Sequence, residues 1–245
     1  MQFQTAQLQT YADVIATAGE ALTAATRSHP EAPVVACPGW SITTLAGHIG
    51  GVHGWATAIV GEGATERPPF PSAPTDVDGA SMADWADAQR EALLSALATS
   101  DPQRIVWVFG AQAPASFWWR RQAHETTVHA WDATAAAGDA YEIPGDMGAD
   151  GLDEFLTAFL PRILRRGDLA WGLGRTVHLH RTDGDGEWLV TIEPSVPISR
   201  EHAKGDLAVR GRGGDLLLWA MNRPADVEVL GDTALADAWA ANVRF

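Results

Sequence analysis

In the first half of the chain, apolar residues recur at intervals of three and four, which is the spacing of an amphipathic helix. In the first such stretch, residues 6–27, these positions are Leu8, Tyr11, Ile15, Ala18 and Leu22. The same spacing predicts a second helix over residues 41–60, with Ser41 as its N-cap, and a third over residues 82–99. Each of these helices has one apolar stripe that must be buried against a neighbour.

A fourth helix is predicted over residues 115–137, because no proline or glycine interrupts this stretch. Four helices with one apolar stripe each bury these stripes most simply as an antiparallel bundle. The second and third helices are joined by a loop rich in proline and glycine, residues 62–81. A loop of this length in a compact domain is often functional, and we expect it to cover the entrance of a site. A short apolar piece, residues 104–109, leads into the fourth helix.

After Gly138 the pattern changes to short alternating runs mixed with short helical ones. The predicted elements are a helix over 151–166, kinked or interrupted near Pro161, a hairpin of strands 176–181 and 188–192 joined through D-G-D-G, a strand 206–210, a helix 214–222, a strand 227–230 and a helix 233–242. The chain is therefore predicted to be an α+β protein. A four-helix bundle would occupy residues 1–140, and a smaller α+β domain would occupy residues 141–245.

Composition narrows the range of functions. A chain of 245 residues with 46% hydrophobic residues can bury a substantial core. A formal net charge of -14 argues against a nucleic-acid partner, because phosphate binding requires a basic surface. No apolar run is long enough to span a membrane and the N-terminus lacks signal-peptide features, so we expect a cytoplasmic protein with no membrane partner. The sequence does not indicate an oligomeric state.

Cys37 is the single cysteine, which excludes an internal disulfide and a thiolate metal cluster. Any bound metal must therefore be held by histidine and carboxylate side chains. Cys37 itself precedes Pro38 and Gly39 in a connection with no evident cationic neighbour, and we interpret it as structural.

The predicted fourth helix carries an unusual polar face. Glu125 and His129 are four residues apart, so both side chains lie on one side of the helix, one turn apart. Asp132 follows three residues later and could orient a metal ligand from behind, but the sequence alone favours a surface residue near the helix end. His124 is five residues from His129 and points elsewhere, and the metalloprotease pattern H-E-x-x-H is absent.

His48 lies in the apolar stripe of the predicted second helix, where a histidine is out of place. With Glu125 and His129 it would supply two imidazoles and one carboxylate, the ligand set of a catalytic zinc site with its fourth position open. The alternative is that His48 is a satisfied core residue, and that Glu125 and His129 are an ordinary pair on a solvated helix. His53 lies about 140° from His48 around the helix and is expected at the rim.

A second pair of histidines, His178 and His180, alternates along a predicted strand, so both rings lie on the same side. Two histidines at this spacing can bind a metal. No third ligand is evident from the sequence, and we interpret the pair as part of an exposed strand face.

Four segments carry a resemblance to a known family. They are C-P-G-W-S-I-T-T-L-A-G-H-I (Cys37 to Ile49), R-R-Q-A-H-E-T-T-V-H-A-W-D (Arg120 to Asp132), V-R-G-R-G-G-D-L-L-L-W-A-M-N-R (Val209 to Arg223) and V-L-G-D (Val229 to Asp232). The N-terminal half resembles the DinB-like bundle of the mycothiol-dependent maleylpyruvate isomerases and their relatives in actinobacteria. The C-terminal half looks like the second domain of the same family, so the resemblance covers nearly the whole chain.

The resemblance implies a divalent metal, typically zinc, at His48, Glu125 and His129, and mycothiol as the thiol cofactor. It also implies an assisting arginine from the second domain, and Arg223 stands in the matching part of the chain, preceded by Asn222 where the family usually has a small residue or glycine. Arg223 and His53 are candidate catalytic residues, and Arg120 and Arg121 are candidate cofactor-binding residues. Each could hold a carboxylate of thiol or substrate, or could instead be a charge at the rim. For Arg223, which has Arg210 and Arg212 near by, a structural role is a further alternative.

Three functions remain open on these observations. The first is a zinc-dependent and mycothiol-dependent transferase or isomerase, in which a thiolate attacks a small electrophile. The second is hydrolysis by a zinc-bound hydroxide, for which the sequence offers no dedicated general base. The third is a protein that binds or senses a thiol or another small molecule without converting it.

Overall fold

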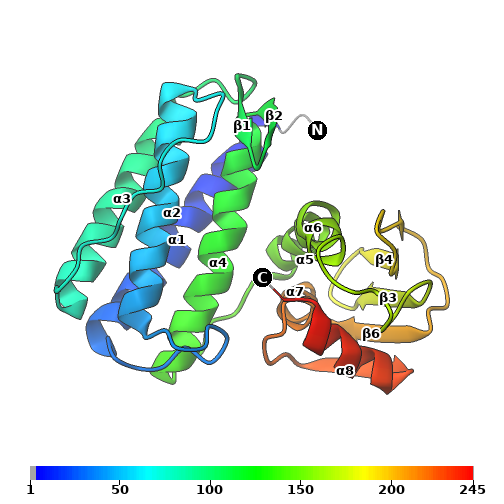
Figure 1. Ribbon diagram of the computed structural model, residues 1–245. Coiled ribbons are helices and arrows are strands. Elements are labelled where there is room, and N and C mark those ends of the chain that lie inside the picture. The colour runs from blue at the N-terminus through cyan, green and yellow to red at the C-terminus, as the bar shows by residue number, and fades with distance from the viewer. Residues whose placement is uncertain (1–3, 245) are drawn as a thin grey trace. The chain divides into compact units, whose positions relative to one another are not determined.

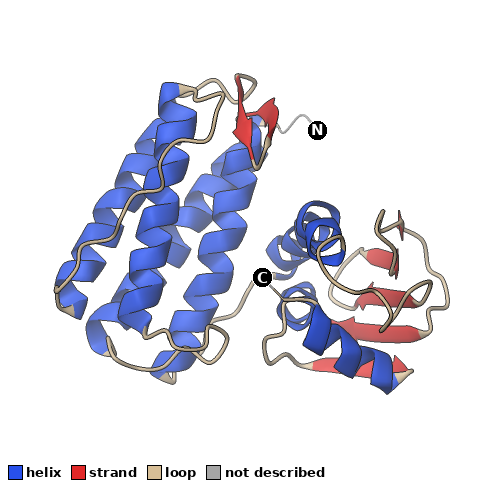
Figure 2. Cartoon of the chain, viewed as in Figure 1, coloured by secondary structure: helices blue, strands red, loops and turns tan. Residues whose placement is uncertain are grey.

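The computed structural model of the protein describes residues 4–244, and these divide into two compact units, Met1–Tyr141 and Glu142–Phe245. Within the described residues, the first unit is helical apart from one short hairpin, and the second combines short helices with a sheet (Figures 1 and 2). The predicted α+β class with a helical N-terminal part is confirmed. None of the helices over residues 4–244 is long and apolar enough to cross a bilayer.

The bundle consists of α1 (Thr5–Ser28), α2 (Ile42–Glu62), α3 (Gly79–Thr99) and α4 (Ser116–Ala137). The Ser41 side chain accepts a hydrogen bond from the Thr44 amide at 3.3 Å, so the predicted N-cap of the second helix is confirmed. The Asp78 side chain caps the third helix by accepting a hydrogen bond from the Ser81 amide at 2.8 Å. This helix therefore starts three residues earlier than the apolar spacing indicated. Apolar side chains of these helices, among them Leu22, Ile42 and Leu45, are completely buried between them.

The apolar piece before α4 is a hairpin of β1 (Ile105–Val108) and β2 (Ala111–Pro114), which the sequence did not predict as a pair. The hairpin is fixed to the start of α4 because the Trp118 indole donates to the Trp107 carbonyl at 3.0 Å. The ring of Trp55 from α2 packs edge to face against both indoles. This aromatic cluster holds α2 and α4 together at one end, and both helices contribute to the site described below.

The second unit contains α5 (Gly145–Glu154), a π-helical turn (Phe155–Phe159), α6 (Leu160–Leu164), β3 (Thr176–Arg181), β4 (Glu187–Thr191), β5 (Ile198–Ser199), β6 (Leu207–Gly211), α7 (Gly213–Ala220), β7 (Val227–Gly231) and α8 (Thr233–Asn242). The interruption predicted near Pro161 takes the form of the π-helical turn directly before it. Proline has no backbone N–H and its ring clashes with the preceding turn of an α-helix, so the widened turn is a physical way to include it.

The five strands form one sheet in the order β5-β4-β3-β6-β7. The predicted hairpin is confirmed, since β3 and β4 pair antiparallel with His180 opposite Glu187. β3 also pairs in parallel with β6, which places His178 opposite Ala208. Along β3, Val177 and Leu179 are completely buried, and the histidines alternate with them on the other face of the strand.

Candidate metal centre

Two helices of the bundle, α2 and α4, bring one histidine and a Glu–His pair together. His48 comes from α2, and Glu125 and His129 come from successive turns of α4, which lies beside α2 in the bundle (Figure 1). The Glu125 Oε1 atom lies 3.3 Å from His48 Nε2 and 3.5 Å from His129 Nε2. One ligand atom from each of the three residues lies within 4.8 Å of the other two. The convergence expected from helix periodicity is therefore present.

The two oxygen atoms of the Glu125 carboxylate have different partners. Arg121, one turn earlier on α4, donates to Oε2 at 2.5 Å, while Oε1 faces the two imidazoles. An arginine that holds one oxygen fixes the orientation of the carboxylate and leaves the other oxygen to act as a single ligand. This role of Arg121 was not expected from the sequence, although its spacing of four from Glu125 could have indicated it.

His129 is oriented from behind by Asp132. The Nδ1 atom of its ring lies 2.9 Å from Asp132 Oδ2, and the Asp132 side chain is completely buried. A carboxylate at Nδ1 sets the ring so that Nε2, on the opposite side, points toward His48 and Glu125. The hypothesis of an orienting role for Asp132 fits this contact, and the alternative of a surface residue is wrong.

The ligand atoms of His48, Glu125 and His129 suit a divalent cation, and so do their surroundings. Two imidazoles and one carboxylate oxygen suit zinc, with a further position open for another ligand. The side chains of His48, Glu125 and His129 are 29%, 23% and 13% exposed, so a small molecule can reach the point between them. The indole of Trp40 packs against the His48 ring with centroids 5.1 Å apart and restricts that ring to one side.

The groups around Glu125 and His129 shift the pKa values of both residues. Burial alone would raise the pKa of Glu125, but Arg121, His129 and His48 hold it well below its usual value. Burial alone would lower the pKa of His129, but its bonds to Asp132 and Glu125 raise it to about 9. The local field therefore favours positive charge at the point where the three ligand atoms converge.

Replacing Asp132 with asparagine should weaken metal binding at this centre by roughly 10- to 100-fold, the usual effect of removing the carboxylate behind a ligating histidine. Asparagine keeps the size of the side chain but loses the charge at His129 Nδ1. The measurement is the Zn²⁺ dissociation constant by competition with a chromogenic chelator, made in a His202→Ala background so that a second group of ligands, described below, does not contribute. Asp139→Asn, the same change at an exposed position after α4, is the matched control, and equal affinities for the two variants would contradict the role given to Asp132.

A cavity of about 550 Å³ adjoins His48. Its walls include Trp40, Thr44 and Met82, and residues 70–77 from the loop between α2 and α3. This volume lies in the range of small-molecule sites. The loop that we expected to cover an entrance therefore does line the space next to one of the candidate ligands.

His53 is buried, and its expected position at the rim is wrong. It is 1% exposed, and its Nε2 lies 2.9 Å from Thr126 Oγ1 of α4, the residue next to Glu125. Burial lowers the pKa of His53 to about 3, so the ring is neutral. Its Nδ1 is buried without a hydrogen-bond partner among the described residues. The contact joins α2 to α4 within one residue of the candidate centre.

The arginines predicted to hold carboxylates lie in different parts of the structure. Arg120 and Arg121 are 8% and 7% exposed, so the alternative of charges at the rim is wrong for both. Arg223 lies in the second unit, just after α7, and donates to the Met221 carbonyl at 2.8 Å. Asn222 before it adopts a left-handed conformation with φ 62°, which asparagine tolerates better than most residues. The asparagine at this position thus has a backbone reason.

Two other residues singled out from the sequence are His124, which lies apart from the three ligands, and Cys37, which lies beside them. His124 is buried against the ring of Tyr11 of α1, so it faces away from the centre as expected. Cys37 forms a group with His129 and Asp132 in which one atom of each lies within 4.8 Å of the others. The sequence showed no cationic neighbour for Cys37, and the fold supplies one in His129.

His178 and His180 belong to the second unit and take no part in this centre. The interpretation of an exposed strand face without further ligands is wrong. His178 is 5% exposed, and Glu187 and His202 lie close to both histidines. His202 comes from an irregular segment, so no periodicity could have indicated it.

A family model described as the mycothiol maleylpyruvate isomerase N-terminal domain matches residues 11–134. A second, described as the MDMPI C-terminal domain, matches residues 146–238. No protein among those with curated descriptions matches the chain.

Two crystal structures with similar folds are both of the mycothiol-dependent maleylpyruvate isomerase, one of them a histidine-to-alanine mutant. The mutant has a TM-score of 0.62 with this chain and the other structure 0.60. Each is 16% identical to this chain, and each match covers 93% of both chains. At this identity the likeness establishes a shared fold.

Proposed function

Because the chain belongs to the mycothiol maleylpyruvate isomerase family, we propose that it is a zinc-dependent and mycothiol-dependent enzyme, a thiol transferase or an isomerase. Its substrate would be a small electrophile. The observation that carries this proposal is the meeting of His48, Glu125 and His129 between α2 and α4, with Arg121 and Asp132 fixing two of the three ligands from behind.

A divalent ion held by these residues would act as a Lewis acid and lower the pKa of a bound thiol, so that the nucleophilic thiolate is present at neutral pH. The residues around it have separate tasks. Arg121 holds Glu125 in a single-ligand orientation. Asp132 orients the His129 ring so that its Nε2, which would hold the ion, faces Glu125. The cavity beside His48 provides room for a thiol or an electrophile.

The proposal also gives roles to His53, Arg120 and Arg223. His53 is proposed to act through Thr126, by setting the register of α4 against α2, and so would be a positioning residue and would not touch the substrate. Arg120 stays the candidate for a carboxylate of the thiol, and its 8% exposure restricts that role to a ligand that enters the bundle. Arg223 stays the candidate from the second unit for a carboxylate of the substrate.

Turnover should require both the metal and mycothiol. We expect metal-loaded protein to convert maleylpyruvate, or another small electrophile from a panel, with mycothiol present, and the rate to fall to background when mycothiol is left out. The measurement is product formation by chromatography with and without the thiol. Conversion that is indifferent to mycothiol would support the hydrolase instead, and calorimetric binding of mycothiol without conversion of any electrophile would support the binding or sensing protein.

Arginine variants in the same assay separate the individual roles. Arg223→Lys should raise KM for the electrophile with the metal content unchanged, and Arg120→Lys should raise KM for the thiol. Arg121→Lys and His53→Gln should lower metal affinity and turnover together. Arg210→Lys is the control, because Arg210 is exposed and paired with Glu228 at 3.0 Å. A variant of Arg121 or His53 that binds metal normally would remove the role given to that residue.

A further inference from the structure

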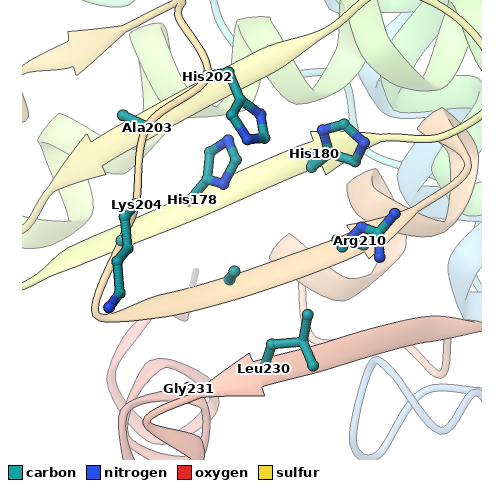
Figure 3. A pocket seen from close by; sticks show the side chains of 10 residues that line it. His178, His180, His202, Ala203, Lys204, Arg210, Leu230 and Gly231 are labelled. Atoms are coloured by element: carbon teal, nitrogen blue, oxygen red, sulfur yellow. The ribbon is translucent and has the colours of Figure 1, made fainter.

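The second unit contains another group of side chains suited to a metal ion. His178, His180, Glu187 and His202 each place one ligand atom within 4.8 Å of the others. The ring centroids of the three histidines are 5.3 to 6.2 Å apart. Figure 3 shows the three rings gathered over the sheet at one end of a pocket that also includes Lys204 and Arg210. All of these residues belong to the second unit.

The sheet and one loop bring the four side chains together. His178 and His180 lie on the same face of β3, and Glu187 lies directly opposite His180 on β4. His202 comes from the segment between β5 and β6. That segment passes very close to β3 at Gly205, where an added Cβ would lie 2.9 Å from the His178 backbone nitrogen. Glycine at this point allows the segment to approach the strand so that His202 reaches the other two rings.

Glu187 lies at the centre of the group. Its Oε2 is 2.6 Å from His178 Nε2, and its Oε1 is 2.7 Å from His180 Nδ1 and 3.1 Å from His202 Nδ1. Three ring nitrogens therefore face one carboxylate from three directions.

The composition of the group favours a cation over an anion. Three imidazoles and one carboxylate are ligands that Zn²⁺ and the neighbouring divalent transition metals prefer. Lys204 and Arg210 line the same pocket of about 450 Å³ and could attract an anion. However, Arg210 is paired with Glu228, and the Glu187 carboxylate lies where the three rings converge.

We propose that His178, His180, Glu187 and His202 form a second metal site, which binds a divalent transition-metal ion such as Zn²⁺ independently of the bundle centre. The ion is held by ring nitrogens that now face Glu187. Its structural effect is to tie the segment carrying His202 to β3 and β4, because His202 is the one ligand of the four outside a strand. This site does not depend on the function proposed above, since all of its ligands lie outside the bundle.

The test uses the full chain with any histidine tag removed and metals stripped by a chelator. The bundle centre is first disabled by His48→Ala with His129→Ala, and the protein is titrated with Zn²⁺ by calorimetry and with Co²⁺ by visible absorption. We expect one ion per chain in this background. Adding His202→Ala should weaken its binding by roughly tenfold or more and reduce the Co²⁺ absorption, while adding His29→Ala, at an exposed position after α1, should change neither.

Two outcomes would overturn the proposal. One is that the variant without the bundle centre binds no ion, and the other is that binding survives His202→Ala combined with His178→Ala. The His202 side chain is 77% exposed, so its replacement removes a ligand without opening a core, and circular dichroism checks that the fold is kept. Limited proteolysis supplies a separate readout, because Zn²⁺ should slow cleavage within residues 200–206 in the parent chain and not in the His202→Ala variant.

Discussion

Replacing His129 with alanine should empty the bundle centre and abolish turnover. The change removes one of three ligands and also the link to Asp132, which leaves His48 and Glu125 with no second imidazole to share the ion. Loss of a supporting residue weakens a metal site by roughly 10- to 100-fold, so loss of a ligand itself should exceed roughly 100-fold. The measurement is metal content after dialysis against a weak chelator, made in a His202→Ala background so that the bundle ion alone is counted.

The matched control is His29→Ala, which removes an exposed imidazole and should leave the metal content unchanged. Circular dichroism should show the same helical content in both variants, because His129 lies in the middle of α4 and alanine favours the helix. A His129→Ala protein that keeps a full complement of metal would show that the three side chains do not form the site.

Replacing Gly148 with alanine should destabilise the second unit by about 3 kcal/mol, the upper end of the usual effect of overpacking. Gly148 lies on α5 where α5 meets the start of α7, and an added Cβ would lie 2.5 Å from the Gly213 carbonyl oxygen, closer than real contacts allow. The atoms nearest to the added Cβ all belong to the backbone of Gly213 and Gly214, so there is no flexible side chain that could move aside. Helix propensity alone predicts the opposite sign, a gain of up to ~1 kcal/mol from alanine.

Gly61→Ala is the control for this prediction. Gly61 is also helical, but an added Cβ meets only ordinary contact with the Ala96 side chain at 3.7 Å, so alanine should be neutral or stabilising there. Native-state hydrogen exchange resolves local stability, so the β6 amides report on Gly148→Ala in the second unit and the α2 amides report on Gly61→Ala in the first. Unchanged or slower exchange in Gly148→Ala would show that the α5–α7 contact is less tight than described.

The glycines at this crossing give a physical reason for part of the family pattern. Gly213 and Gly214 belong to the stretch V-R-G-R-G-G-D, and a Cβ on Gly214 would lie 2.5 Å from the carbonyl oxygen of Ile143. The two helices therefore approach each other backbone to backbone. The G-G pair in this stretch serves the packing of α7, which in turn contacts β3, β6 and β7.

Much of the fold could be predicted from the sequence because it depends on local spacing. The 3.6-residue period identified the first three helices of the bundle, and the absence of proline and glycine identified the fourth. The alternation around D-G-D-G identified the β3–β4 hairpin. The same local geometry placed Glu125 and His129 on one side of α4 and turned His124 away. Such conclusions need the conformation of a single element and no knowledge of its neighbours.

Burial and partners could not be predicted in this way. His53 was expected at the rim and lies buried against Thr126, and Arg120 and Arg121 are buried in the same bundle. Helix periodicity assigns a direction to each side chain, but it does not say how deeply a polar residue lies once another helix packs over it. Arg121 shows the difference, because its spacing from Glu125 could be read from the sequence and its burial could not.

The sequence by itself determined which side chains leave each helix or strand in the same direction, since that follows from the repeat of the backbone. The tertiary structure decided which of these directions meet. His48 and Glu125 are 77 residues apart, and their contact depends on the packing of α2 against α4. His202 joins His178 and His180 from a segment with no periodic structure, where the position of a side chain is set by long-range packing alone.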